Sequence, residues 1–162
     1  MYKMIILLFI SLTFLFSAQN LNDDLDNDLV PNAIDKCPNT PEGVFVKRDG
    51  CTKPLYRNIY FNHASAVVSD KFYKVIQNTA ELITETPGYT IFISGHTDSI
   101  SDAKSNMKLS KKRAMIVQDI LVKNNVDVNK IKLSWYGETM PVASNITHLG
   151  RSENRRVNIV LK

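Results

Sequence analysis

The sequence predicts an α/β protein, an α+β two-layer sandwich in which helices cover a sheet. Segments that alternate apolar and polar residues, as strands do, are separated by segments with apolar residues at helical spacing. Strands separated by helices favour right-handed crossover connections and a sheet with helices packed on it. The apolar pattern begins at Leu55, so residues 54–162 are expected to form the folded domain.

The first elements of this domain are a strand near residues 55–61 and a helix at about residues 70–85. Ser69 is suited to the N-cap of the helix, and Pro87 with Gly88 ends it. The apolar residues of the helix share one face, which must cover the sheet: Phe72, Val75, Ile76, Ala80 and Ile83.

The remaining elements continue this order along the chain. Residues 89–94 and 131–136 alternate apolar and polar side chains, which suits strands. A second helix is expected between them, at about residues 103–124, and a last strand at residues 156–161.

The N-terminus has the layout of a secretory signal peptide at residues 1–18. Lys3 precedes an uncharged run from Ile5 to Phe16, and the small residues Ser17 and Ala18 follow it. The run has about 12 residues, fewer than the roughly 20 that a membrane-spanning helix needs, so a retained anchor is the less favoured alternative. We therefore expect export from the cytoplasm; a location in the periplasm or at the outer membrane of a Gram-negative envelope is what the family resemblance given below implies.

Residues 19–53 read as an acidic, turn-built segment without a periodic apolar pattern. Cys37 and Cys51 are the two cysteines of the chain, and an exported protein meets an oxidising compartment in which thiols pair. A Cys37–Cys51 disulfide is therefore expected, with two unpaired thiols as the alternative. The formal net charge is +4, with the basic residues concentrated after Asp98. Such a basic region can attract nucleic acid or another anionic polymer, but export argues against nucleic acid, and a solvated lysine surface is the alternative.

Carboxylates recur at alternate positions in this segment, at Asp24, Asp26 and Asp28. Calcium binds six to eight oxygens, and such spacing lets one loop wrap an ion; a plain disordered linker is the alternative. The pattern departs from an EF-hand because Leu29 stands where glycine makes the turn. Continued to the cysteines, the segment resembles a thrombospondin type 3 calcium repeat. That resemblance implies these calcium ligands: Asp24, Asp26, Asp28, Asn32 and Asp35.

A candidate binding site follows the strand at residues 89–94, where Thr97 and Asp98 stand at the strand end that usually carries binding residues. Arg113 lies in the apolar stripe of the next helix, where an unpaired charge is costly. Two arrangements would compensate the buried charge of Arg113. Asp98 and Arg113 form a buried ion pair, or they flank a cleft that binds the ammonium and carboxylate of a zwitterion.

Several motifs occur in order from Leu55 to the C-terminus and together resemble the OmpA-like peptidoglycan-binding domain. They are Gly95-His96-Thr97-Asp98, the run from Asn106 to Ala114, Tyr136-Gly137-Glu138 and Asn154-Arg155-Arg156-Val157. The resemblance implies a βαβαβ-type fold with a mixed sheet, and non-covalent binding of the diaminopimelate of peptidoglycan stem peptides.

Carried over to this chain, the resemblance makes Asp98 and Arg113 the pair that grips the ligand. It implies supporting roles for Asn106, Thr97 and Arg156. Ser101 stands where the family commonly has glycine, which predicts a conformational cost if that position has a positive φ.

No catalytic set is apparent. The histidines His63, His96 and His148 have no metal-binding spacing, and no serine or cysteine stands in a recognisable nucleophile motif. The sequence therefore predicts no enzyme and no required cofactor, with calcium as the one candidate ion. The expected partners are peptidoglycan and an outer- or inner-membrane protein that supplies a tether. The alternative is a periplasmic scaffold or accessory subunit of a membrane complex, such as a flagellar stator or a secretion assembly.

Overall fold

The computed structural model describes residues 23–162, so the expected signal peptide lies outside the described residues. The elements are β1 (Leu55–Tyr60), α1 (Asp70–Glu85), β2 (Ile91–Gly95), α2 (Ala103–Lys123), the 3-10 helix η1 (Val128–Lys130), β3 (Ile131–Trp135), α3 (His148–Asn154) and β4 (Arg156–Leu161). The predicted α/β fold is confirmed, and the predicted strands and helices are present with ends shifted by one or two residues.

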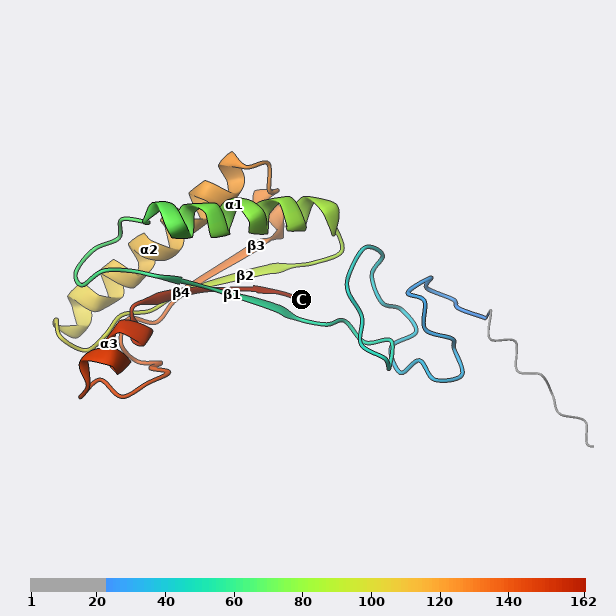
Figure 1. Ribbon diagram of the computed structural model, residues 1–162, viewed down its shortest axis with the longest axis horizontal. Helices are drawn as coiled ribbons and strands as arrows, with labels where there is room; N and C mark the ends of the chain where they lie inside the picture. The colour runs from blue at the N-terminus through green and yellow to red at the C-terminus, as the bar shows by residue number, and fades with distance from the viewer. Residues whose placement is uncertain (1–22) are drawn as a thin grey trace, which may run out of the picture.

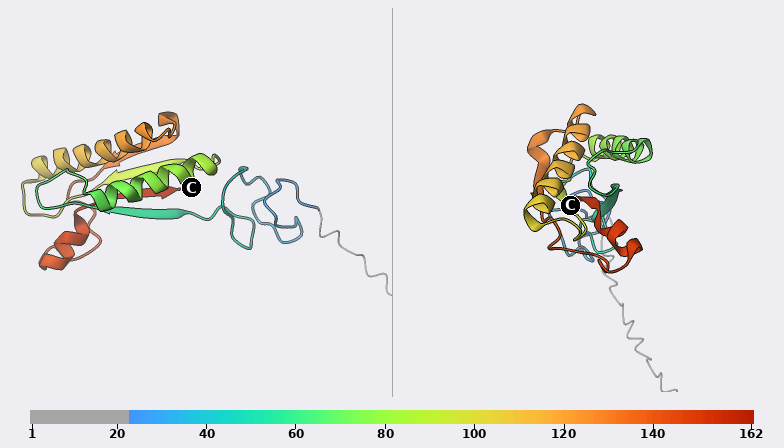
Figure 2. Two further views of the ribbon diagram at one scale, coloured as in Figure 1. Left: turned by 45° about the horizontal axis from the view of Figure 1, so that its top comes forward. Right: turned by 90° about the vertical axis from the view of Figure 1, so that its left-hand side faces the viewer.

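The four strands form one mixed sheet in the order β1-β4-β2-β3. β2 and β3 are parallel and are joined through α2, whereas β4 is antiparallel to both β1 and β2. α1 and α2 cover one face of this sheet, and α3 lies on the other side at one end (Figures 1 and 2). Central β4 is therefore the most buried strand, with Val157, Ile159 and Leu161 facing the helices.

The helix caps differ in part from the expectation. Ser69 occupies the N-cap position of α1, but its side chain accepts no hydrogen bond from the helix. At α2 the cap is Asp102, whose side chain accepts from the Ser105 backbone N–H at 2.9 Å. Helix α3 was not predicted, because seven residues are too few for a clear apolar repeat.

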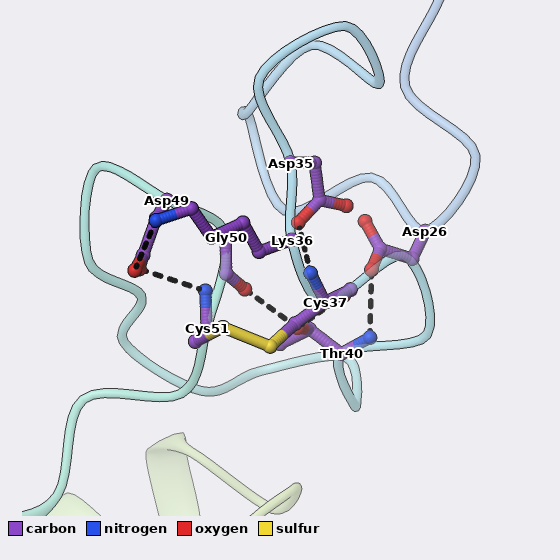
Figure 3. The surroundings of a disulfide bond; sticks show 8 residues. All are labelled: Asp26, Asp35, Lys36, Cys37, Thr40, Asp49, Gly50 and Cys51. Carbon is purple, nitrogen blue, oxygen red and sulfur yellow. Dashed lines mark hydrogen bonds and ion pairs between the residues drawn. A yellow bond between two sulfur atoms is a disulfide. The ribbon is translucent and has the colours of Figure 1, made fainter.

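The described part of the acidic segment, residues 23–53, contains turns and one isolated bridge between Val46 and Thr52. The predicted disulfide is present, with Cys37 and Cys51 joined at an S–S distance of 2.00 Å (Figure 3).

Tyr89, at the end of the sheet nearest this segment, connects the segment to the domain. Its hydroxyl accepts from the Phe45 N–H at 2.9 Å and donates to the Lys53 carbonyl at 3.0 Å. Within residues 23–162, no helix is both long and apolar enough to cross a membrane.

Candidate functional site

The site lies at the end of the sheet opposite the acidic segment, where β2 ends and α2 begins (Figure 1). Thr97 and Asp98 follow β2 directly, and both are almost fully buried. Across from them lies the loop of residues 61–69 between β1 and α1. Within this loop Ala64 has a φ of 51°, an uncommon conformation for a residue with a side chain and one that often marks a functional loop.

Arg113 is 0% exposed and donates to three backbone carbonyls, two in the loop of residues 61–69 and one after β2. Its Nε donates to Ser65 at 2.8 Å, its Nη1 to His96 at 3.0 Å and its Nη2 to Asn62 at 3.0 Å. The guanidinium also lies over the Phe61 ring, 4.9 Å from its centroid. Arg113 thus fixes the loop that faces Asp98.

The buried ion pair considered for Asp98 and Arg113 is not formed, since no contact within 4.0 Å joins them among the described residues. Burial lowers the pKa of Arg113 to about 10, and the charge of Asp98 opposes this change. Asp98 and Arg113 therefore attract each other electrostatically without direct contact, and backbone carbonyl oxygens accept the hydrogen bonds of the guanidinium.

Asp98 instead pairs with Arg155, whose Nη1 lies 3.0 Å from Asp98 Oδ2. His63 Nδ1 is 3.7 Å from the same oxygen, and Arg155 Nε also donates to the Phe61 carbonyl at 3.1 Å. The sequence alone did not identify Arg155 as a site residue; its neighbour Arg156 was predicted in that role instead. Strand alternation was the available signal, because Arg155 shares the parity of Val157, which faces the helices.

Arg156 points away from this site, to the sheet face opposite α1 and α2. Its Nε donates to Asn158 Oδ1 at 2.8 Å, and its Nη2 contacts the Met140 carbonyl at 3.4 Å. Arg156 is therefore not brought together with Asp98, in contrast to the role expected for it as a site residue.

Asn106 lies in the first turn of α2 and is buried. Its Nδ2 donates to the Ser101 carbonyl at 2.9 Å and to the Glu138 carboxylate. It thereby connects the loop after Asp98 to the loop after β3. Ser101 is not among the residues with positive φ, so the conformational cost considered for this position does not arise.

His96 lies on the same sheet face as Arg156 and is buried against Tyr136, with 5.5 Å between ring centroids. The pKa of His96 is lowered to about 4, chiefly by burial and in addition by the positive charge of Arg156. The imidazole is thus neutral in the folded protein across the physiological pH range.

This neutral histidine predicts a loss of stability in mild acid. Because the unfolded chain binds the proton at the ordinary pKa of 6.5 and the folded chain at about 4, stability falls as the pH drops between these values. From pH 7 to pH 5 the histidine should remove about 2 kcal/mol of unfolding free energy. Urea unfolding at both pH values should show a smaller decrease for His96→Gln, and equal decreases for the two proteins would contradict this assignment.

The acidic segment contains a second group of polar side chains. Oxygens of Asp24, Asp26 and Asp28 lie within 4.8 Å of one another. Each of these carboxylates, and that of Asp35, accepts a backbone N–H through one oxygen and leaves the other buried without a partner. Figure 3 shows Asp26 and Asp35 facing the disulfide region.

This arrangement fits a hard cation, which takes oxygen ligands and offsets their repulsion. Burial raises the pKa of Asp28, and the charges of Asp26, Asp35 and Asp24 raise it further. Leu29 adopts a φ of 70°, so the turn expected to need glycine forms with leucine. Asn32 differs from the aspartates, because its Oδ1 already accepts from the Leu25 N–H at 3.1 Å.

Comparison with known proteins gives the family of the domain. Residues 60–155 match the model of the OmpA family. Outer membrane porin F of Pseudomonas aeruginosa is 37% identical over 140 residues, which are 83% of this chain and 40% of the porin. The peptidoglycan-binding protein ArfA of Mycobacterium bovis is 35% identical over 103 residues, 64% of this chain and 32% of ArfA.

Among solved structures, the peptidoglycan-associated lipoprotein of Burkholderia pseudomallei superposes with a TM-score of 0.63 at 28% identity. The match covers 65% of this chain and 90% of the lipoprotein chain. The chain spans less than half of the length of the curated relatives named here. These relatives agree with the prediction that the chain is not an enzyme. With the family model matched over most of the folded domain, the chain belongs to the OmpA family.

Proposed function

We propose that residues 54–162 bind peptidoglycan non-covalently, through the diaminopimelate of its stem peptides, and link an envelope component to the cell wall. The observation that carries this proposal is a buried carboxylate, that of Asp98, which lies 3.0 Å from the Arg155 guanidinium at one end of the domain. Its Oδ2 contacts Arg155 and His63, and its Oδ1 has no hydrogen-bond partner among residues 23–162. A carboxylate in this setting accepts an ammonium group strongly.

In this proposal Asp98 Oδ1 accepts a hydrogen bond from the ammonium group of the diaminopimelate. The carboxylate group of the diaminopimelate lies toward Arg155 and Arg113. Arg155 is the more accessible guanidinium, with 12% of its side chain exposed. Arg113 has five N–H donors and uses three on carbonyls, so its main role is to hold the loop at residues 61–69. The similarity to ArfA, a peptidoglycan-binding protein, supports the same ligand class.

Replacing Asp98 with asparagine is expected to lower retention of the protein on purified sacculi. The loss of a charged contact in a desolvated site typically costs at least about 2 kcal/mol, or roughly thirtyfold in affinity. Co-sedimentation of the full chain with diaminopimelate-containing sacculi measures this. Asp119→Asn, at an exposed position of α2, is the matched control and should bind like the wild type. Wild-type protein that stays in the supernatant would refute wall binding and leave partner docking as the main role.

We also propose that residues 1–18 direct export and that the protein resides in the periplasm or at the outer membrane. The relatives support this location, since one is an outer membrane porin and another a peptidoglycan-associated lipoprotein. A membrane partner would then supply the tether. Determination of the mature N-terminus tests the processing step, and an N-terminus at Met1 would contradict cleavage.

Calcium binding is a further proposal, for the segment of residues 24–35. Its support is the set of four buried, unpartnered carboxylate oxygens, one each from Asp24, Asp26, Asp28 and Asp35. The ion would offset the repulsion among these carboxylates and hold the segment against the disulfide.

Removal of calcium with a chelator is therefore expected to increase trypsin cleavage after Lys36 and Arg48 several-fold, because ligand binding stabilises only the folded segment. Limited proteolysis with mass spectrometry measures the cleavage rates. The Asp26→Asn variant should be cleaved at the chelated rate with or without calcium, whereas Asp23→Asn, at an exposed position outside the cluster, should retain the response. Equal rates for the wild type in calcium and in chelator would exclude the ion.

A further inference from the structure

The sheet face opposite α1 and α2 is here called the far face. Among residues 23–162, α3 is the one helix on this side of the sheet, and it lies at one end (Figure 2). The strand register arranges its side chains in three rows across the sheet. The first row is Tyr56, Val160, Phe92 and Lys132; the second is Asn58, Asn158, Ser94 and Ser134; the third is Tyr60, Arg156, His96 and Tyr136.

The middle row consists of amides and hydroxyls that are ordered by hydrogen bonds. Asn158 Nδ2 donates to Asn58 Oδ1 at 2.7 Å, and Asn158 Oδ1 accepts from Arg156 Nε at 2.8 Å. Arg156 therefore fixes which way the Asn158 amide faces, and that amide orients Asn58 in turn. None of the twelve residues that form the far face is a carboxylic acid.

The aromatic rings of the first row are open to solvent, with Tyr56 63% exposed and Phe92 36%. The third row is covered, because Arg156 and His96 are each only 4% exposed and Arg156 contacts the Met140 carbonyl. Its two tyrosines lie at the ends of the row, where Tyr60 packs on Phe72 of α1 and Tyr136 stacks on His96. Tyr56 and Phe92 lie in one row with a single strand between them, so their Cα atoms are about 10 Å apart. This separation is close to the length of a disaccharide.

We propose that the far face binds a neutral, N-acetylated glycan strand. Sugar rings present C–H faces that pack on aromatic rings and hydroxyl and acetamido edges that hydrogen-bond to amides. The far face offers both side by side, with Tyr56 and Phe92 in the first row and amides and hydroxyls in the middle row. A protein partner is the weaker fit, because the centre of the face is a row of polar side chains and has no aliphatic cluster to bury.

The charges at the border of the face complement a glycan that carries acidic peptides. Lys162 Nζ lies 4.6 Å from the Phe92 ring centroid, and Lys132 ends the same row. Identification of this glycan as the sugar backbone of the cell wall rests on the proposed function, whereas the preference for N-acetylated sugars rests on the far face alone. The same polymer would then contact the domain through its peptide at Asp98 and through its sugars on the far face.

The test uses a peptide-free probe, the β-1,4-linked tetramer of N-acetylglucosamine, added to the full chain while backbone amide resonances are recorded. We expect saturable shifts in β1, β4 and β2, with a several-fold weaker affinity for Tyr56→Ala. Tyr73→Ala is the matched control, since Tyr73 is 39% exposed on α1, away from the far face. Shifts confined to the loops around Asp98, or no shifts at all, would overturn the inference.

Asp98→Asn separates this inference from the proposed function. The variant should bind the tetramer as the wild type does while its retention on sacculi falls. If Asp98→Asn abolishes tetramer binding, the sugar lies in the Asp98 site and the far face is not its surface. If the tetramer binds the far face but the wild-type protein does not bind sacculi, glycan binding by the far face stands and the proposed function fails.

Discussion

Replacing Arg113 with alanine is expected to lower the free energy of unfolding by about 3–5 kcal/mol, the range for removal of one side of a buried charged network. Three carbonyls, of Asn62, Ser65 and His96, would lose their donor, and the Phe61 ring would lose its cover. The contact with the His96 carbonyl is buried, and a buried carbonyl left without a donor is costly. Chemical denaturation monitored by circular dichroism measures the effect.

Lys112→Ala is the matched control for this experiment, because Lys112 is the exposed neighbour of Arg113 on α2. It should change the unfolding free energy by no more than about 0.5 kcal/mol. An Arg113→Ala variant as stable as this control would show that the three carbonyl contacts are dispensable.

The expected instability matters for any binding study of this site. Loss of sacculus binding by Arg113→Ala would follow from a displaced loop at residues 61–69 even if Arg113 never touched the ligand. Asp98→Asn is the more informative variant, because Asp98 is held by side chains at its edge and connects no backbone segments.

The fold was largely predictable because the strands and the two long helices bury one face each. That requirement leaves a repeating apolar pattern, which α1 shows in Ile76, Ala80 and Ile83. Helix α3 buries only Gly150 and Asn154, so its sequence contains no such pattern. It is held instead by specific contacts, such as Asn154 Oδ1 accepting the N–H groups of Val142 and Ala143.

The site was predictable in part, and for a different reason. The stripe position of Arg113 indicated a buried cation, which is correct, but burial alone does not say what satisfies a guanidinium. Asp98 was the nearest acid in the sequence, whereas three backbone carbonyls from two segments lie closer in space. The pairing of Asp98 with Arg155 joins residues 57 positions apart, and only the tertiary fold brings them together.

Replacing Gly95 with alanine is the other change expected to have a large effect, because α2 crosses the end of β2 at this glycine. A Cβ at Gly95 would lie 2.1 Å from the Ser110 carbonyl oxygen and 3.2 Å from Ala114 Cβ. These atoms belong to the helix backbone and its buried face, so no flexible side chain can move aside. The helix must shift away from the strand or the protein must remain strained.

We expect Gly95→Ala to lower the unfolding free energy by at least about 3 kcal/mol, at the upper end for overpacked sites. The shift would also move Arg113 away from the His96 carbonyl, which it contacts at 3.0 Å, and so weaken the site that Gly95 itself does not line. Ser94→Ala, one residue earlier and on the far face, is the control and should cost less than about 1 kcal/mol. Because the clash is with backbone, a Gly95→Ala protein of wild-type stability would mean that β2 and α2 are not packed as closely as the Gly95 contact requires.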